Sequence, residues 1–571
     1  SSYYAYDVRV IRNKYFPLPL TAYTFNRAAY EAAGNTGAED GSAFLTKTVN
    51  LTQPSLNDKY SDLKTKTFNF RINYDKSFNE HNISAFASYE QAEEFGESFN
   101  ASRQYFISGA LPYLSAGGDK DKNNGGTASI DARVNYFGRI SYNYKETYLL
   151  QFSLRSDASI RFPKGNRVGT FPSVLAGWVA SNENFWGVNN PVSFLKLKAS
   201  WGQLGNDAIR PFQFLASYDI VAGGVYGADR LYQTSLAQAV MPNLAITWES
   251  VNSYNAGFES MLFNNKLTFN ADFFYQRRSN ILTPRNASVP EYAGISLPPE
   301  NFGIVANRGV EIELGFRDRK GDFSYNINGN FAFARNKIIE FDEPAQSVAW
   351  QRRTGHPIGS QLLYKAIGIF RDLDQISKTP HVINAIPGDV IIQDTNGDGV
   401  INNDDKILFD KNVDPEITFG LAFNFRYKNI ELSGLVNGVN TAMKQMLGSQ
   451  QGTSGNYYMY YADGRWTPDN IDAKKPRAYQ GYTPYWRNTH RTDMEFQQLD
   501  YARLKNLQLA YHLPASVVSK LRVQSALFYV SGQNLFLIYA SKGIWDPEFG
   551  GGDRDNYPLM RTLAVGANIS F

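Results

Sequence analysis

The feature that most constrains this chain is a hairpin of two long arms with alternating side chains, at residues 307–335. Residues 310–314 read Val-Glu-Ile-Glu-Leu, and the return arm from Phe323 to Phe333 alternates aromatic or isoleucine residues with Ser and Asn. Successive side chains of a strand point to opposite faces, so both arms are apolar on one face and polar on the other. Both are longer than the five or six residues usual for soluble strands. A bilayer-crossing strand needs about 9–11 residues and alternates between lipid and a wet lumen. The hairpin therefore favours membrane-spanning strands, with a soluble β-sandwich pair as the alternative.

Composition favours the membrane alternative. The 571 residues include 36 Tyr and 39 Phe, yet the mean hydropathy is only −0.39. The sequence has no run of about 18 apolar residues, which a transmembrane helix requires. A closed barrel is the other structure that pairs every backbone group in lipid. The lack of cysteine excludes disulfides and thiolate metal sites, and a net charge of +3 without a basic block gives no sign of a nucleic-acid partner.

The alternation recurs along the chain in about 16 arms, each near the spanning length. Besides the two arms of the hairpin, they lie at 3–12, 68–75, 83–89, 133–143, 148–155, 171–180, 195–204, 254–263, 267–277, 417–427, 430–439, 501–513, 523–535 and 560–571.

The connections between arms alternate in length. Short turns fall near residues 81, 145, 264, 321 and 428, whereas the connections 96–129, 205–251, 279–306, 336–415, 440–500 and 536–559 are long. Short periplasmic turns and long external loops produce this alternation in an up-and-down barrel, whereas sandwiches and propellers have no reason to separate loop lengths in this way. We therefore predict an all-β, antiparallel transmembrane β-barrel.

One long loop, at 384–414, holds a motif with calcium-binding spacing. The twelve residues from Asp394 to Asp405 place oxygen-bearing side chains at positions 1, 3 and 5, with glycine at position 6, as in an EF-hand loop. An Asp replaces the usual Glu at position 12, and no amphipathic helices flank the loop. The motif predicts a structural Ca²⁺ site, and an Asx-rich surface turn is the alternative. The predicted ligands are Asp394, Asn396, Asp398, the carbonyl of Val400, Asn402 through water, and Asp405.

A second long loop is rich in aromatic residues, whose faces stack on sugars or apolar peptide groups. We take these residues as substrate-binding candidates, although packing within the loop is the interpretation we favour for each of them singly. They are Tyr457, Tyr458, Tyr460, Tyr461 and Trp466. Catalytic motifs are absent from the sequence: its five histidines fall in no metal-binding spacing, and it has no nucleophile elbow or phosphate-binding loop. We therefore predict that the protein is not an enzyme.

Several blocks, taken in order, resemble the SusC/RagA-type TonB-dependent transporters of Bacteroidota outer membranes. The blocks are residues 137–144 (Phe-Gly-Arg-Ile-Ser-Tyr-Asn-Tyr), 155–157 (Arg-Ser-Asp) with 171–173 (Phe-Pro-Ser), 195–202 (Leu-Lys-Leu-Lys-Ala-Ser-Trp-Gly), 307–311 (Asn-Arg-Gly-Val-Glu), the loop at Asp394, 465–468 (Arg-Trp-Thr-Pro), 504–506 (Leu-Lys-Asn) with 513–514 (Leu-Pro), and 534–536 (Asn-Leu-Phe) before 546–548 (Asp-Pro-Glu). Their order and spacing cover residues from about 130 to the end.

The resemblance implies a 22-stranded barrel filled by an N-terminal plug. A SusD-like lipoprotein covers the external mouth in this family, and the TonB complex supplies energy. Residues 1–571 would form the later strands of such a barrel. The plug, the TonB box and the first strands have no counterpart in this sequence, and we expect them to precede Ser1 in the full protein.

Two functions are consistent with these features. The first is TonB-dependent import of an oligosaccharide or peptide nutrient across the outer membrane of a Gram-negative, Bacteroidota-like bacterium, with a SusD-like lipoprotein and the TonB complex as partners. The second is a structural role, in which the SusC-like barrel is one subunit of a larger outer-membrane assembly and does not transport actively. Outer-membrane lipid surrounds the barrel in both.

Overall fold

The computed structural model describes most of the chain and is almost entirely β-structure. The described residues are 2–15, 20–25, 45–50, 55–106, 110–187, 190–238, 241–285, 297–343, 348–411, 413–445, 462–478, 485–487, 489–541, 546–549 and 559–571.

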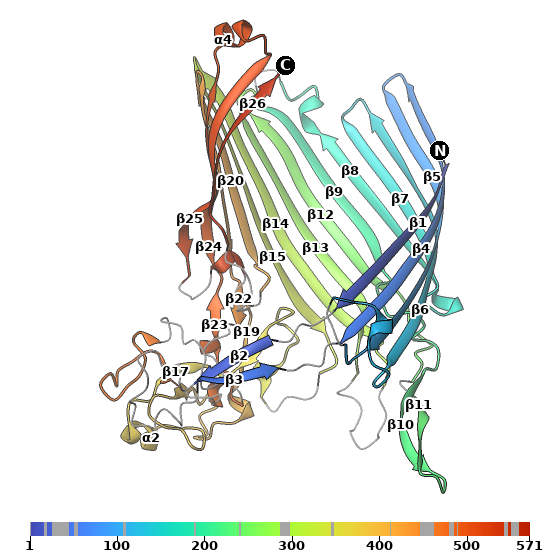
Figure 1. The fold of residues 1–571 in the computed structure, drawn as a ribbon. Coiled ribbons are helices and arrows are strands. Elements are labelled where there is room, and N and C mark those ends of the chain that lie inside the picture. Colours follow the sequence, from blue (N-terminus) through green and yellow to red (C-terminus); the bar gives the residue numbers. More distant parts are fainter. Residues whose placement is uncertain are drawn as a thin grey trace.

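One antiparallel sheet of 16 strands dominates the structure, and each of its strands pairs with the next one along the chain (Figure 1). Its strands are β1 (Ser2–Tyr15), β4 (Leu56–Phe78), β5 (His81–Arg103), β6 (Asn123–Tyr144), β7 (Tyr148–Ser159), β8 (Val168–Val179), β9 (Val192–Asn206), β12 (Glu249–Leu262), β13 (Leu267–Thr283), β14 (Glu300–Lys320), β15 (Phe323–Glu340), β20 (Ile417–Tyr427), β21 (Ile430–Asn440), β24 (Tyr501–His512), β25 (Ser525–Ala540) and β26 (Thr562–Ser570). The sheet curves into a trough with β1 and β26 at its two edges.

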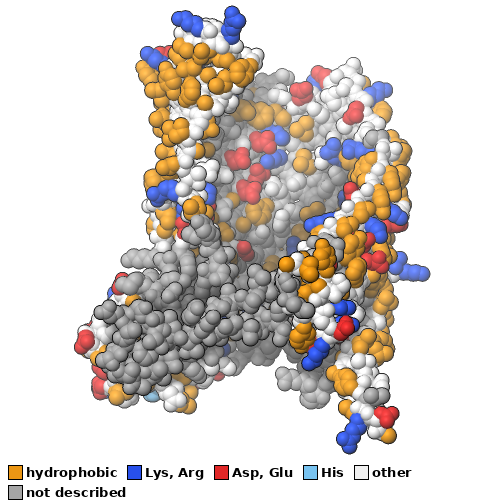
Figure 2. All heavy atoms as spheres, in the orientation of Figure 1, with side chains coloured by type: hydrophobic (Ala, Val, Ile, Leu, Met, Phe, Trp, Pro, Cys, Tyr) orange, Lys and Arg blue, Asp and Glu red, His pale blue; other side chains and the backbone are white. Residues whose placement is uncertain are grey.

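The two faces of the sheet differ as the alternation predicts. On the convex face, Leu314 of β14 and Phe273 of β13 are about half exposed, at 49% and 57%. On the concave face the register pairs Asp272 with Glu311, and Lys198 of β9 forms an ion pair with Asp272 at 2.9 Å. Figure 2 looks onto the concave face, where acidic and basic side chains gather at mid-height. An apolar convex face and a charged concave face are the pattern of a barrel wall with lipid outside and a wet lumen inside.

The two ends of the sheet carry connections of different length. At one end the hairpins turn in a few residues: β4 ends at Phe78 and β5 begins at His81, and β20 ends at Tyr427 and β21 begins at Ile430. Asn79 and Lys428 in these turns have left-handed φ values of 51° and 52°, which tight hairpin turns require. The long connections lie at the other end, shown at the bottom of Figure 1. The predicted antiparallel barrel architecture, with its separation of turn lengths, is confirmed.

Three strands are much longer than the sequence pattern indicated. β4 and β5 have 23 residues each and β6 has 22, so parts of the predicted loop 96–129 are strand. These extensions lie toward the end with the long loops, where both faces meet water and apolar–polar alternation is no longer required. Strand pairing with a neighbour sets their length, and a single sequence does not reveal that pairing.

The long connections carry smaller elements of their own. Five two-stranded sheets lie within the described ranges: β2 (Leu20–Phe25) with β3 (Leu45–Asn50), β10 (Tyr218–Tyr226) with β11 (Leu231–Gln238), β16 (Gln361–Leu363) with β19 (Ile407–Phe409), β17 (Ala366–Ile369) with β18 (Val390–Ile392), and β22 (Met443–Gln445) with β23 (Phe496–Gln498). The described helices are α2 (Leu373–Lys378), α4 (Ala515–Lys520) and the 3₁₀ turns η2 (Leu114–Ala116), η3 (Lys164–Asn166), η4 (Ala180–Asn182), η6 (Ala349–Gln351), η7 (Asn403–Asp405), η8 (Tyr485–Arg487), η9 (Asp493–Glu495) and η10 (Pro547–Phe549). No helix in these ranges is long and apolar enough to cross a membrane.

Candidate functional site

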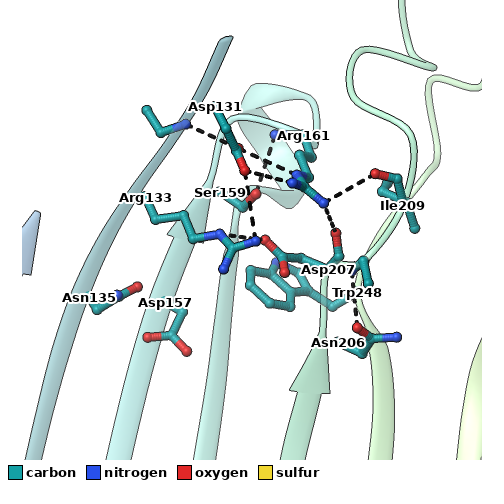
Figure 3. Close-up of polar contacts among 12 residues, drawn as sticks. Asp131, Arg133, Asn135, Asp157, Ser159, Arg161, Asn206, Asp207, Ile209 and Trp248 are labelled. Carbon is teal, nitrogen blue, oxygen red and sulfur yellow. Dashed lines mark hydrogen bonds and ion pairs between the residues drawn. The ribbon is translucent and has the colours of Figure 1, made fainter. Parts of the chain in front are cut away.

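A network of four charged side chains lies at the loop end of strands β6 to β9 (Figure 3). Nη2 of Arg161 donates to the Asp131 carboxylate at 2.6 Å. Nη1 donates to the carbonyls of Asp207 at 3.2 Å and Ile209 at 3.3 Å. Arg133 of β6 forms an ion pair with Asp207 at 3.1 Å. The network joins β6 to the segments that follow β7 and β9, so it fixes three neighbouring parts of the rim to one another. We call it the rim network.

A small apolar core packs beside the rim network. Its buried members are Phe162, Phe171, Ile209, Ile246 and Trp248. The Trp248 ring lies 5.1 Å from that of Phe162 and 5.5 Å from that of Phe171, and its indole N–H donates to the carbonyl of Arg167 at 3.1 Å. Buried aromatic side chains with a satisfied polar atom contribute strongly to local stability. This core therefore gives the rim network a rigid support.

Gly205 of β9 makes that packing possible. A Cβ at this position would lie 1.9 Å from Cζ of Phe171, which is inside van der Waals contact. The Phe171 ring thus occupies the space that any larger residue at position 205 would need. Tight packing of this kind tolerates no added methyl group without displacement of the ring.

The concave face forms a pocket of about 750 Å³ beneath the rim network. It extends from Trp248 and Arg133 at the rim to Phe86, Phe137 and Arg139 nearer the short-turn end. Arg155 and Asp157 of β7 also line it and form an ion pair at 2.6 Å. The pocket combines guanidinium groups, carboxylates and aromatic rings on an otherwise polar wall. Its lining is therefore mainly polar and charged, with aromatic rings between the charged groups.

The sequence did not identify the rim network. Arg161 is 30 residues from Asp131 and 46 from Asp207, and Arg133 is far from Asp207 along the chain, so only the barrel register brings these partners together. A partial signal was present, because the blocks that carry the family resemblance include Phe137, Arg139, Arg155 and Asp157. The alternation placed Arg139 on the polar face, but it did not indicate that these four residues share one pocket.

The two longest external loops pack against each other. Tyr364, Ile392 and Ile401 form one buried cluster, and Tyr485 from the other loop packs against it. Tyr485 also packs on the neighbouring cluster of Ile369, Val390 and Trp486. Segments of both loops therefore share apolar cores, and we call this unit the loop module.

Two acids of the loop module have a pKa raised by burial. Asp389 is 2% exposed, and burial raises its pKa to about 6, although a hydrogen bond from the Ile386 N–H and the charge of Arg477 act against the shift. Burial likewise raises the pKa of Asp493, whose carboxylate accepts the Ala366 N–H at 2.8 Å. A carboxyl in an apolar setting prefers its neutral form. The stability of the loop module therefore depends on pH.

The six predicted calcium ligands lie in one compact loop. Asp394 accepts the backbone N–H groups of Gly397 at 2.7 Å and Gly399 at 2.8 Å, and Asp398 accepts that of Val400 at 2.8 Å. Asn396 accepts the Asp398 N–H at 3.1 Å.

At the end of this loop, Asp405 is fully buried. Its two carboxylate oxygens accept the N–H groups of Thr395 and Asn402, at 2.7 and 2.8 Å. Asn402 in turn caps η7 by accepting the Asp404 N–H. Asp405 thus joins the two ends of the loop. Within the described ranges, no group of three or more Asp, Glu or His side chains is arranged to hold a metal. Calcium binding stays a prediction.

Trp466 is the aromatic candidate that the structure describes. Its indole N–H donates to the Arg371 carbonyl at 3.1 Å, and the Arg477 guanidinium lies 5.8 Å from its ring. It also packs on the cluster around Val390, so its contacts are those of a loop-packing residue. Tyr457, Tyr458, Tyr460 and Tyr461 lie outside the described residues. A substrate-binding role for this set stays a prediction.

Comparisons with known proteins agree with this architecture. Residues 3–535 match the family described as "TonB dependent receptor-like, beta-barrel". "TonB-dependent receptor P3" of Formosa agariphila is 29% identical over 535 residues, covering 88% of this chain and 52% of that protein. "TonB-dependent receptor SusC" of Bacteroides thetaiotaomicron is 26% identical and covers 78% of this chain and 44% of that protein. The chain spans about half the length of the curated relatives it matches.

A solved structure titled "Structure of the RagAB peptide transporter" superimposes with a TM-score of 0.72 at 24% identity, over 91% of this chain and 56% of that one. At this identity the likeness concerns the fold. Proteins of this family are transporters and not enzymes. The match over nearly the whole chain, the 16-stranded sheet and its two contrasting faces lead to one conclusion: the chain belongs to the TonB-dependent receptor-like β-barrel family and is of the SusC/RagA type.

Proposed function

We propose that this chain is the main part of the barrel wall of a TonB-dependent importer. The importer lies in the outer membrane of a Gram-negative bacterium of the Bacteroidota type and takes up an oligosaccharide or peptide nutrient. The single observation that carries the proposal is the contrast between the faces of the sheet. Leu314 on the convex face is 49% exposed, whereas Lys198, Glu259 and Asp272 form a line of ion pairs on the concave face. A wall of this kind encloses a wet path through lipid.

The position of the pocket supports import and not scaffolding alone. The pocket faces the concave side and is bounded by the rim network at the end where the long loops lie. A nutrient that enters between these loops would reach the rim end of the concave face. In the complete protein, further strands join the edges β1 and β26, and a plug and a TonB-binding segment complete the importer. A SusD-like lipoprotein closes the mouth over the loop module.

The test uses the full-length protein in its native cell. Deletion of its gene should abolish uptake of one oligosaccharide or peptide class, and loss of TonB should have the same effect. A tagged full-length protein should copurify with a surface lipoprotein encoded alongside it. Uptake that is unchanged after deletion, together with loss of outer-membrane integrity, would contradict import and favour a structural subunit.

We also propose that the Asp394–Asp405 loop holds Ca²⁺ as a structural ion. The donor atoms in the loop are all oxygen, which is what Ca²⁺ takes, and each carboxylate oxygen that accepts one N–H retains a second lone pair. The ion would neutralise the charges of Asp394 and Asp398 and stiffen one side of the loop module. No step of import passes through it.

A further inference from the structure

We propose that the connection between β24 and β25 is a binding site for an anionic phospholipid of the periplasmic leaflet. It consists of α4 and the residues around it, 513–524, and we call it the basic turn. Lys520 and Arg522 hold the phosphate group, while Val517 and Leu521 contact the acyl chains. The inference needs only the orientation of the barrel in the membrane, so it applies equally to an importer and to a structural subunit.

The basic turn differs from the tight hairpin turns at the same end of the sheet. Twelve residues, 513–524, join β24 to β25, whereas residues 79–80 alone join β4 to β5. Figure 1 shows α4 beyond the ends of the neighbouring strands. In Figure 2 basic side chains lie over α4, with hydrophobic side chains directly below them on the wall. The turn therefore lies where the barrel leaves the hydrocarbon and meets lipid headgroups.

The apolar surface of the wall continues onto the basic turn. Tyr511 and Phe528 lie opposite each other in the register and are 46% and 47% exposed on the convex face. Val517 of α4 and Leu521 just after it are four residues apart and share one side, where they are 39% and 58% exposed. Val518 is buried, and α4 packs against β25. An exposed apolar stripe that continues a lipid-facing wall fits the boundary between headgroups and acyl chains.

The charges of the basic turn are positive and unmatched. No Asp or Glu occurs between residues 501 and 545. Lys520 and Arg522 are exposed, and neither forms an ion pair within the described ranges. Two cations beside an apolar stripe match a phosphate that is attached to acyl chains.

Other lysines at this end of the sheet have acidic partners. The pairs are Lys145 with Glu80 at 3.2 Å, Lys266 with Asp318 at 3.0 Å, and Lys428 with Asp322 at 3.9 Å. The basic turn thus differs from these turns in charge as well as in length.

The backbone at Arg522 gives independent support. The Arg522 N–H donates to the Ser519 carbonyl and the Val523 N–H to the Val518 carbonyl, both at 3.3 Å, so α4 ends in a Schellman motif. Arg522 occupies the left-handed position of this motif, with a φ of 56°, where glycine is usual because it has no Cβ. Backbone conformation favours glycine here, so we assign the arginine side chain a role of its own.

Hydrogen exchange with mass spectrometry on the full-length protein tests the site in two kinds of nanodisc. One holds phosphatidylcholine alone, and the other holds phosphatidylcholine and phosphatidylglycerol in equal shares, with the same acyl chains. The peptide that covers residues 513–524 should exchange at least about tenfold more slowly in the anionic nanodiscs. The reason is that each basic residue near an anionic surface strengthens binding by about fivefold.

Two variants separate lipid binding from helix stability. Lys520→Gln combined with Arg522→Gln should remove most of the difference between the nanodiscs. Arg522→Gly should exchange no faster than the unmodified protein in phosphatidylcholine, because glycine suits the left-handed position, yet it should lose about fivefold of the protection in anionic nanodiscs. Lys145→Gln is the matched control, since it removes a cation that Glu80 already pairs, and it should leave exchange of this peptide unchanged. Heat-modifiable migration on gels checks that each variant folds.

Three results would overturn the phospholipid site. The first is equal exchange of the peptide in the two nanodiscs. The second is an equal loss of protection with Lys145→Gln, which would show a general effect of charge. The third is faster exchange by the same factor in both nanodiscs for the double variant, which would show that the cations act only on the carbonyls at the end of α4. None of these results depends on uptake, so the import function is tested separately.

Discussion

Replacing Asp389 by Asn should stabilise the loop module at neutral pH. The carboxyl is 2% exposed, and burial raises its pKa from 3.8 to about 6. A raised carboxyl pKa means that the folded module binds a proton more tightly than the unfolded one does. The module is therefore most stable below about pH 4 and loses stability as the pH rises toward 6. Above pH 6 the loss of unfolding free energy is complete. A pKa that rises from 3.8 to about 6 on folding corresponds to about 3 kcal/mol, because each tenfold change in an acid dissociation constant is worth about 1.4 kcal/mol.

Asn avoids this loss of stability and keeps the hydrogen bond with Ile386. Its amide oxygen can still accept the Ile386 N–H, which Asp389 accepts at 3.0 Å. The loss of attraction to Arg477 offsets part of the gain, so we expect an increase of about 1–3 kcal/mol in the local opening free energy at pH 7. At pH 4 the variant and the unmodified protein should differ by less than about 0.5 kcal/mol.

Hydrogen exchange with mass spectrometry on the full-length protein measures this directly. The peptide that covers β18 follows Asp389 along the chain, and its protection reports opening of the module. Rates are corrected for the intrinsic pH dependence of exchange. Asp374→Asn is the control: it removes the exposed ion pair between Asp374 and Lys378 on α2, and an exposed pair contributes little, so β18 protection should stay within about 0.5 kcal/mol of that of the unmodified protein. Equal or reduced β18 protection in Asp389→Asn at pH 7 would refute the argument that an ionised carboxylate is buried there.

Three further outcomes are expected. Gly205→Ala should lower the barrel melting temperature on heat-modifiable gels by an amount equivalent to about 1–3 kcal/mol, because the new methyl group would meet Phe171, whereas Gly165→Ala, with nothing within 4 Å, should not lower it. Arg161→Gln should speed proteolysis at the rim, since the ion pair with Asp131 is lost, and unchanged cleavage would contradict a bracing role. Chelation with EDTA should speed proteolytic cleavage within the Asp394–Asp405 loop and leave the barrel intact. Equal cleavage with and without EDTA would favour the alternative, an Asx-rich surface turn that binds no calcium.

The sequence was most informative where the chain crosses the bilayer. Ile417–Tyr427 is both the predicted arm and the observed strand β20, because lipid on one face and water on the other impose strict alternation. Outside the bilayer that constraint ends, and the pattern failed. The loop ends of β5 and β6 were predicted as coil, and the hairpin of β10 and β11 was not predicted at all.

The candidate site was less predictable than the fold. The resemblance blocks contained Arg139 and Arg155, but nothing in a single sequence shows that Phe86 and Phe137 hold their guanidinium groups. Such contacts depend on which strands are neighbours and on their register, which set the spacing of side chains across the sheet. Local motifs are different, since the hydrogen bonds of the Asp394–Asp405 loop form within twelve consecutive residues.

In a barrel wall, one face of the sheet meets lipid and the other meets water. The chain has no cysteine, so single cysteines placed along residues 310–314 of β14 can carry a spin label in the full-length protein in bilayers, once any cysteine elsewhere is removed. Labels at Val310→Cys, Ile312→Cys and Leu314→Cys should be accessible to dissolved oxygen from the lipid, whereas those at Glu311→Cys and Glu313→Cys should not. Uniform accessibility, or alternation with the opposite phase, would contradict this orientation of the two faces.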